Sequence, residues 1–275
     1  MNEPLEQFHI TSIKHRKLSV RELWSYRELL RRMSHRQYRL RAGKSFLNLI
    51  WPFIRPAVMT LALIYLRQMS GANFGVDLPY PLYVFSGLCF WFFFAELTIN
   101  LAGSLSSNAS LLQKVYFPPI VPPLAIMISR LPELLLILLA VGGLQIYFGV
   151  GLSEFWWALI PALLTLFALA AGIGLLFAGL SLVYSDVTRI LEVILYLGLF
   201  LSPVFFAIEI YPETVRGFFA MNPMGGVLSA IRGSLFTGIG IDWSSWGYAL
   251  ISAAALLLAG ISVFVRAEHL VRENG

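Results

Sequence analysis

Apolar segments long enough to cross a lipid bilayer fill most of this chain beyond residue 45. A membrane-spanning helix needs about 20 mostly apolar residues, because the hydrocarbon core offers backbone amides and carbonyls no partner outside the helix. The composition agrees, since 58% of the 275 residues are hydrophobic and 13% are charged. The spans are predicted at residues 46–67, 81–103, 119–148, 155–183, 188–207 and 243–265. We therefore expect an all-α integral membrane protein with six transmembrane helices.

The basic residues predict the orientation of these spans. Six spans place both termini on one side, and loops rich in Lys and Arg stay in the cytoplasm. A block of lysines and arginines from Lys14 to Lys44 precedes the first span, whereas the opposite side receives only Arg67, Arg216 and Arg232 outside the spans. Both termini are therefore expected in the cytoplasm. The net charge of +5 needs no nucleic-acid partner, because membrane orientation and anionic lipid headgroups explain it.

The chain divides into two predicted regions, a cytoplasmic tail with an interfacial helix at residues 1–45 and a transmembrane domain at residues 46–275. Between Leu23 and Met33, apolar residues recur at helical spacing while arginines intervene. This pattern is typical of an amphipathic helix that lies in the membrane interface. The alternative is a plain orientation signal with some helical character.

Several charges lie within the predicted spans, where an ionisable side chain suggests a function. Arg130 and Glu133 are three residues apart, so they are expected to pair on one helix face. Arg55 and Glu96 have no such local partner, and they either pair across the first two helices or face a hydrated cavity. A proton-coupled carrier would use Glu96 as a titrating carboxylate.

In the fourth span Ala170, Gly174 and Ala178 repeat every four positions, which predicts the close approach of another helix.

No pattern of residues predicts an enzyme, a metal site or a cofactor in this chain. The four histidines lie in the terminal segments without clustered cysteines or carboxylates, and Cys89 is the only cysteine. The sequence Gly43-Lys44-Ser45 looks like the end of a phosphate-binding loop, but Tyr38 stands where that loop needs a glycine. If the work of this protein consumes ATP, we expect another chain to bind it.

Two connecting segments carry patterns beyond membrane spanning. Residues 104–123 begin with small polar residues, where Asn108 is expected to cap a short helix, and end in a proline cluster. Exposed apolar side chains on that helix would form a docking surface for a partner protein; the alternative is an ordinary loop. Residues 203–240 are apolar but broken by Pro and Gly, which predicts short re-entrant helices between the fifth and sixth spans. They would line or gate an exit, or form a plain extracytoplasmic cap.

The segment Leu112-Gln113-Lys114-Val115-Tyr116-Phe117-Pro118 resembles the signature of permease subunits of type-2 ABC (ABC-2) exporters, in the branch that moves lipid-linked polysaccharides such as O-antigen or teichoic acid. Further matching motifs follow in the same order as in that family: Tyr38-Arg39-Leu40-Arg41, Trp51 and Pro56, Tyr80-Pro81-Leu82, Tyr184-Ser185-Asp186-Val187, Leu201-Ser202-Pro203-Val204, and Asn222-Pro223-Met224 with Arg232. Arg55 departs from the pattern, because the family commonly has glutamine there.

The resemblance implies a homodimer of this chain in a bacterial inner membrane, bound to two copies of an ABC ATPase subunit that holds ATP and Mg. It assigns the contact with that ATPase to Asn108, Leu112, Gln113, Lys114, Val115, Tyr116, Phe117 and Pro118. The lipid-linked polysaccharide would move to the outer face through a path between the two permeases. Alternative functions are an ABC-2 exporter of a drug or simple lipid and, from another class, a proton-coupled carrier.

A hydrated sugar chain on a diphospholipid predicts three kinds of residue along its path. Arg39, Arg41 and Lys44 are expected to attract phosphates at the cytoplasmic entrance, unless they contact ordinary anionic lipid. The channel lining is assigned to Trp51, Arg55, Tyr65, Phe85, Trp91, Glu96, Tyr196 and Phe200. These aromatics would otherwise fill helix interfaces or anchor the protein at the membrane surface. The exit gate is assigned to Pro203, Asn222, Pro223 and Arg232.

Overall fold

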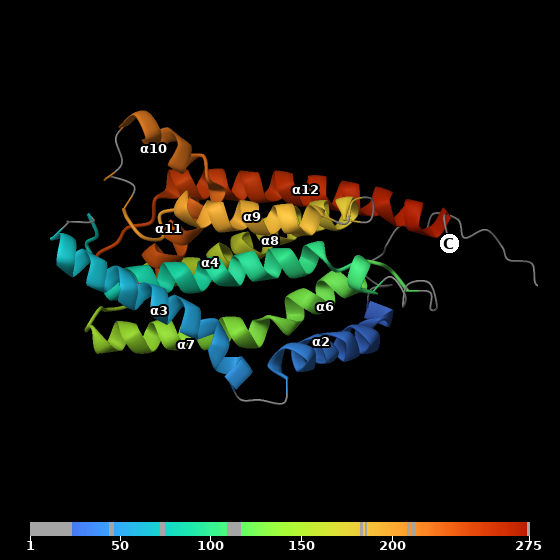
Figure 1. Ribbon diagram of the computed structural model, residues 1–275, viewed down its shortest axis with the longest axis horizontal. Coiled ribbons are helices and arrows are strands. Elements are labelled where there is room, and N and C mark those ends of the chain that lie inside the picture. Colours follow the sequence, from blue (N-terminus) through green and yellow to red (C-terminus); the bar gives the residue numbers. More distant parts are fainter. Residues whose placement is uncertain are drawn as a thin grey trace, which may run out of the picture.

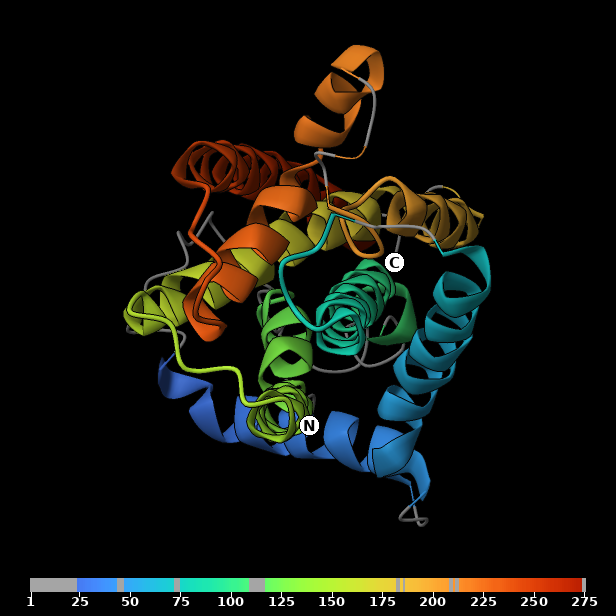
Figure 2. The same cartoon turned by 90° about the vertical axis from the view of Figure 1, so that its left-hand side faces the viewer.

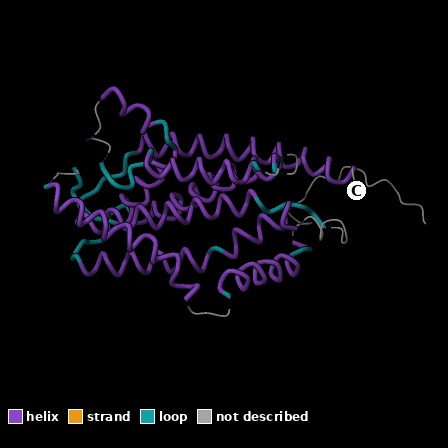
Figure 3. The backbone as a smooth tube through the Cα atoms, viewed as in Figure 1, coloured by secondary structure: helices purple, strands orange, loops and turns teal. Residues whose placement is uncertain are grey.

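The computed structural model describes residues 24–43, 47–71, 75–108, 117–181, 184, 186–207, 210 and 213–273. These residues form helices joined by short connections (Figure 1), and the tube in Figure 3 contains no strand among them. The α-helices are α2 (Arg27–Ala42), α3 (Leu47–Ser70), α4 (Tyr80–Ala102), α6 (Val121–Ser129), α7 (Leu131–Tyr147), α8 (Leu159–Leu180), α9 (Val187–Phe200), α10 (Glu213–Ala220), α11 (Pro223–Leu235) and α12 (Trp243–Glu273). Two 3-10 turns, η1 (Ser106–Asn108) and η2 (Trp156–Ala158), precede α6 and α8. The all-helical prediction is confirmed.

Within these described ranges, five helical segments are long and apolar enough to cross a membrane: Ile50–Ser70, Tyr80–Ala102, Val121–Tyr147, Trp156–Leu180 and Trp243–Ala267. They correspond to five of the six predicted spans. The remaining prediction, residues 188–207, coincides with α9, which has 14 residues and reaches about 21 Å. This is shorter than the roughly 30 Å hydrocarbon core. The chain then continues from Leu201 to Phe206 as turns.

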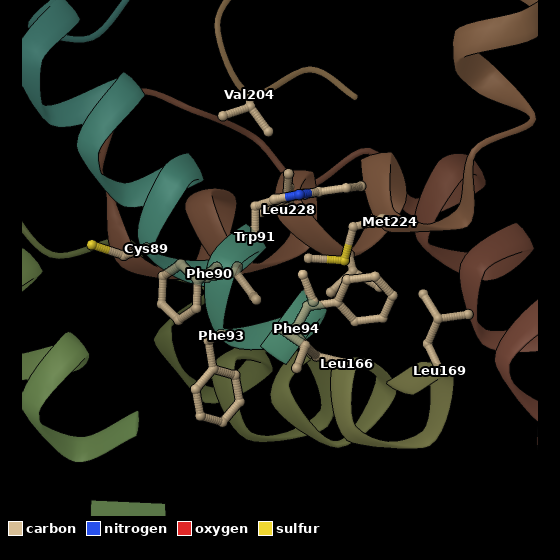
Figure 4. Close-up of a cluster of buried hydrophobic side chains, with 14 of the residues drawn as sticks. Cys89, Phe90, Trp91, Phe93, Phe94, Leu166, Leu169, Val204, Met224 and Leu228 are labelled. Carbon is tan, nitrogen blue, oxygen red and sulfur yellow. The ribbon is translucent and has the colours of Figure 1, made fainter. Parts of the chain in front are cut away.

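Helix α4 occupies the centre of the bundle, with the other long helices around it (Figure 2). Its apolar residues surround the whole helix, as expected of a buried helix, and 78% of its apolar window is buried compared with 11% for α3. Figure 4 shows Phe90, Phe93 and Phe94 of α4 beside Leu166 of α8 and Met224 of α11, members of one hydrophobic core.

Glycines let α8 approach its neighbours closely. A Cβ on Gly174 would collide with Leu101 of α4, which confirms the close approach predicted from the small-residue repeat. A Cβ on Gly172 would lie 2.6 Å from the backbone of Leu256 in α12, and one on Gly260 would collide with the carbonyl oxygen of Gly172. Helices α8 and α12 therefore pack backbone to backbone.

The predicted third span, residues 119–148, is interrupted. Helix α6 ends at Ser129 and α7 begins at Leu131, with Arg130 at the break. Pro132 stands in the first turn of α7 and has no amide hydrogen for a helical hydrogen bond, so a continuous helix is disfavoured there.

Helix α2 packs its apolar side against the rest of the protein. Met33 is buried with Phe117, Val121 and Ala125, and Leu30 packs against this group. The sequence assigns this side to the membrane interface, but an amphipathic pattern does not distinguish lipid from protein as its cover. In the structure, protein covers Met33 fully and Leu30 in part, whereas Trp24 is exposed.

Candidate functional site: a charge cluster, an aromatic face and an arginine clamp

Five charged side chains join four elements of the bundle; we call Arg41, Arg55, Glu96, Arg130 and Glu133 the charge cluster. Arg130 at its centre is 1% exposed. Its Nη1 donates to Glu96 Oε2 at 3.0 Å and also to Glu133 Oε2. A buried charge requires such partners, because removing it from water is otherwise very unfavourable. The predicted Arg130–Glu133 pair is confirmed.

The other two arginines lie at the edges of the cluster. Arg55 Nη1 of α3 is 3.9 Å from Glu96 Oε1, so these residues pair across the first two spans, and both also line a cavity. Arg41 Nη1 of α2 is 3.6 Å from Glu133 Oε2. Burial, and then the nearby charge of Arg130, lower the pKa of Arg41 to about 10. The cluster thus links α2, α3, α4 and α7 by electrostatic contacts.

A cavity of about 210 Å³ adjoins the charge cluster. Its lining includes Tyr38, Trp51, Cys89 and Ser129 together with Arg41, Arg55, Glu96 and Glu133. Ligand pockets usually measure about 300–1,000 Å³. This cavity therefore has room for a small charged group such as a phosphate, and not for a chain of sugars.

The aromatic residues predicted to line a channel divide into two groups. Trp51 and Tyr65 on α3 and Tyr196 and Phe200 on α9 are all exposed, and the last two rings meet edge to face with centroids 5.8 Å apart. Figure 2 shows α3 and α9 flanking α4 on the same side of the bundle. We call these four side chains the aromatic face.

Trp91 and Phe85 do not belong to the aromatic face. Trp91 is 3% exposed, and a Cβ on Gly198 of α9 would lie 3.2 Å from its ring. Gly198 therefore admits the indole between α4 and α9, and the prediction that Trp91 lines a channel is wrong in this structure. Phe85 is half-buried and packs against the core.

At the other end of α4, Arg232 of α11 binds backbone carbonyl groups. Its Nη1 donates to the carbonyl of Pro203 at 2.6 Å, and its Nη2 donates to those of Tyr83 and Val204 at 2.9 and 3.2 Å. The guanidinium carbon also lies 3.6 Å from the centroid of the Tyr83 ring, a favourable cation–π arrangement. We call Arg232, Tyr83 and the carbonyls that they bind the arginine clamp.

The remaining predicted gate residues lie around this clamp. Pro203 is buried, Pro223 occupies the first turn of α11, and Asn222 caps that helix by accepting the amide of Met224 at 3.0 Å. Arg232 itself is 3% exposed, and with Pro203 and Asn222 it lines a cavity of about 420 Å³.

Of the predicted ATPase contacts, the structure describes Asn108, Phe117 and Pro118; Leu112, Gln113, Lys114, Val115 and Tyr116 lie outside the described residues. Asn108 is buried and donates to the Ser104 carbonyl at 2.9 Å. Phe117 is 3% exposed because it packs with Met33 between α2 and α6. The expectation that Phe117 is exposed is therefore wrong.

Of the predicted entrance residues, Arg39 is exposed, Arg41 joins the charge cluster, and Lys44 lies outside the described residues.

Sequence reasoning missed Tyr83 and Gly87, which complete the clamp. A Cβ on Gly87 would collide with Arg232 Nη2, so only glycine leaves room for the guanidinium. A glycine inside a long apolar helix is a usable signal, because it is about 0.5–1 kcal/mol less favourable there than alanine. The signal says that something approaches closely but not what it is.

Comparison with known proteins gives consistent matches over most of the chain. A family model described as ABC-2 type transporter matches residues 28–236. The O-antigen export system permease protein RfbA of Myxococcus xanthus is 27% identical over 220 residues, covering 78% of this chain and 82% of the relative. A Klebsiella pneumoniae protein of the same name is 22% identical over 245 residues, 88% and 93% of the two chains. The polysialic acid transport protein KpsM of Escherichia coli is 23% identical over 241 residues, 85% and 91% of the two chains.

Proposed function

The chain belongs to the ABC-2 type transporter family, and from this membership we propose that it is the transmembrane subunit of an ATP-driven exporter of lipid-linked polysaccharide. The observation that carries the proposal is the near full-length similarity to permeases named for O-antigen export and polysialic acid transport. The cargo would move from the cytoplasmic face to the outer face of a bacterial inner membrane.

The aromatic face supports a path between two copies of this chain. Trp51, Tyr65, Tyr196 and Phe200 present rings to the outside of the bundle, and ring faces can contact the C–H surfaces of sugars without selecting one sugar sequence. In a homodimer the aromatic faces of the two copies would oppose each other across the path. Two copies of an ATPase subunit, with ATP and Mg, would complete the exporter.

The proposed topology has six crossings. Helix α9 and the following residues 201–207 would make the fifth crossing, and α10 and α11 would be re-entrant on the outer side. Helix α2, in the predicted region 1–45, would lie at the cytoplasmic interface beside the transmembrane domain 46–275. This arrangement agrees with the block of basic residues from Lys14 to Lys44, which favours cytoplasmic termini.

The residues between Asn108 and Pro118 would dock on the ATPase. Because Phe117 is packed against Met33, we assign it a different role from its neighbours: Leu112 to Tyr116 would contact the ATPase, and Phe117 would pass the movement to α2. Helix α2 ends beside the charge cluster, where Arg41 contacts Glu133.

The cytoplasmic entrance for the lipid diphosphate is proposed at Arg39, Arg41 and Lys44. The 210 Å³ cavity beside Arg41 and Arg55 has space for a phosphate. Glu96 and Glu133 also line it and pair with these arginines, so a phosphate would have to displace a carboxylate from them.

The proposal is tested by purifying this chain in mild detergent with its bound proteins and measuring ATP hydrolysis and polysaccharide export. A Walker-motif ATPase should co-purify. Tyr116→Ala should weaken its binding, whereas Phe117→Ala should retain the ATPase but reduce export per ATP hydrolysed. Leu40→Ala, at an exposed position of α2, is the control. A chain that purifies without any ATPase, in a cell that still exports, would refute the proposal.

The two alternative functions separate in the same system. Accumulation of a drug or a simple lipid, and not of polysaccharide, would identify another ABC-2 exporter. A proton-coupled carrier would lose transport in Glu96→Gln and on collapse of the proton gradient. The contacts of Glu96 with Arg130 at 3.0 Å and Arg55 at 3.9 Å disfavour that role, because they give this carboxylate a structural part in the charge cluster.

A further inference from the structure

Residues 201–206 leave the helical hydrogen-bond pattern, and side chains from two other helices bind their carbonyl groups. Tyr83 Oη donates to the carbonyls of Pro203 and Phe206 at 3.1 and 3.3 Å. Asn222 Nδ2 donates to the carbonyl of Leu201 at 3.1 Å. Arg232 binds Pro203 and Val204, as described above. Irregular backbone within a membrane is tolerated only where such partners satisfy it.

The charge of Arg232 makes this arrangement unusual. No carboxylate forms a salt bridge with it among the side chains that the structure describes. The buried guanidinium is therefore compensated by carbonyl dipoles and by the ring of Tyr83. Because a buried cation without partners is very unfavourable, Arg232 strongly favours the conformation that keeps these carbonyls in place.

The clamped segment continues directly from the aromatic face. Phe200 ends α9, and its ring lies 5.7 Å from that of Phe205, which is buried inside the clamped segment. A shift of residues 201–207 therefore moves the end of α9 that carries Tyr196 and Phe200.

We propose that Arg232 and Tyr83 are positioning residues that hold residues 201–207 in the closed state of the outer exit, and that export requires this segment to leave them. The inference rests on the proposed function for the existence of an exit. Sugar hydroxyl groups both donate and accept hydrogen bonds, so a polysaccharide chain that reaches this point can donate to the carbonyls of Pro203 and Val204 and accept from the guanidinium of Arg232 that leaves them. The cargo itself then favours opening.

The test measures the resting leak of the complete exporter in proteoliposomes. The probe is a small hydrophilic dye, and neither ATP nor cargo is present. Arg232→Lys keeps the charge but loses the planar fork that reaches several carbonyls. Loss of one hydrogen bond from a charged donor is expected to shift the closed-to-open equilibrium, and hence the leak, by about tenfold. Tyr83→Phe removes one hydroxyl group and should give a smaller increase.

Matched substitutions keep the measurement specific. Arg189→Lys changes an arginine that is 84% exposed, and Tyr248→Phe removes a hydroxyl that bonds Met221 outside the clamp; both should leak like the natural protein. Gly87→Ala retains both donors but displaces the guanidinium, and should also leak. A merely structural role would lower thermal stability without raising the leak of assembled complexes.

The outcomes separate the two proposals. If the Arg232→Lys variant does not assemble with its partner subunits, the leak of the Tyr83→Phe complex decides whether the clamp closes the exit. Assembled Arg232→Lys and Tyr83→Phe complexes that remain as tight as the natural protein would overturn the clamp as a closing device. Since the leak is measured without cargo, a failure of polysaccharide export would contradict the proposed function and leave the leak result interpretable.

Discussion

Arg130 and Arg232 are both buried, but their charges are compensated in different ways. Arg130 has two carboxylates, Glu96 and Glu133, whereas Arg232 has carbonyl oxygens and an aromatic ring. The Arg130–Glu133 pair could be predicted because three residues separate its members on one helix. The arginine clamp could not be predicted, because a sequence does not show which backbone carbonyl groups lack a helical hydrogen bond.

Replacing Arg130 by methionine should be strongly destabilising. Two carboxylates would lose their buried partner, which typically costs about 3–5 kcal/mol. The measurement is the free energy of unfolding in mixed detergent micelles. Arg189→Met is the control, because its contact with Asp186 joins two exposed side chains and such pairs contribute about 0–1 kcal/mol. Equal losses in the two variants would contradict a buried, partnered Arg130.

Asp242 should make the free energy of unfolding depend on pH in the acidic range below about pH 4. Its carboxylate accepts hydrogen bonds from Ser244 and Ser245 at the start of α12. The side chain of Ser244, then that of Ser245, lowers the pKa of Asp242 below its ordinary value. The stabilisation is therefore complete above about pH 4 and is lost as the pH falls through the lowered pKa.

Thermal unfolding of the Asp242→Ala variant and of the natural protein, compared over a range of pH, tests this pH dependence. The variant should be less stable by about 1 kcal/mol at pH 7, and the difference should shrink as the pH falls below about 4. Asp242→Asn keeps a capping oxygen without a titrating group and serves as the control. A difference that stays constant down to pH 2 would exclude the ionised cap.

Among the elements, apolar length predicted five spans, but it did not predict the break within the third span or what covers α2. The break at Arg130 follows from Pro132. The sequence shows this proline, but it does not show whether the proline kinks the helix or divides it. The sequence did not show what covers the apolar side of α2, because that side could face lipid or protein. Trp91 was misassigned for a similar reason: α4 is apolar all round, so its sequence does not tell which side meets α9.

The crossing of α8 and α12 should be intolerant of added volume. Gly260→Ala places a methyl group against the carbonyl of Gly172, and overpacking of this kind typically costs about 1–3 kcal/mol. Gly247→Ala on the same helix meets nothing within 4 Å. It should be neutral or stabilising by up to about 1 kcal/mol, because alanine favours helix more than glycine does. Unfolding in detergent compares the two; similar effects would contradict the close crossing.

For the whole molecule, the distribution of basic residues predicts which ends of the helices face the cytoplasm. Two variants carry a single cysteine in a Cys89→Ser background. Leu152→Cys places it between α7 and α8, and Tyr184→Cys places it between α8 and α9; both positions are exposed. A membrane-impermeant maleimide should label the cysteine at 152 in intact cells and the one at 184 only after permeabilisation. The reverse pattern would invert the proposed topology.

The difference in burial between α4 and α3 has a consequence for how such a protein can evolve. Helices α4, α8, α11 and α12 hold one another through core side chains and close backbone crossings, whereas α3 has only 11% of its apolar window buried. If the proposed function holds, substitutions on the exposed sides of α3 and α9 would change the chemistry offered to a cargo with little effect on folding. Lineages can diverge in what they export while they inherit an unchanged scaffold.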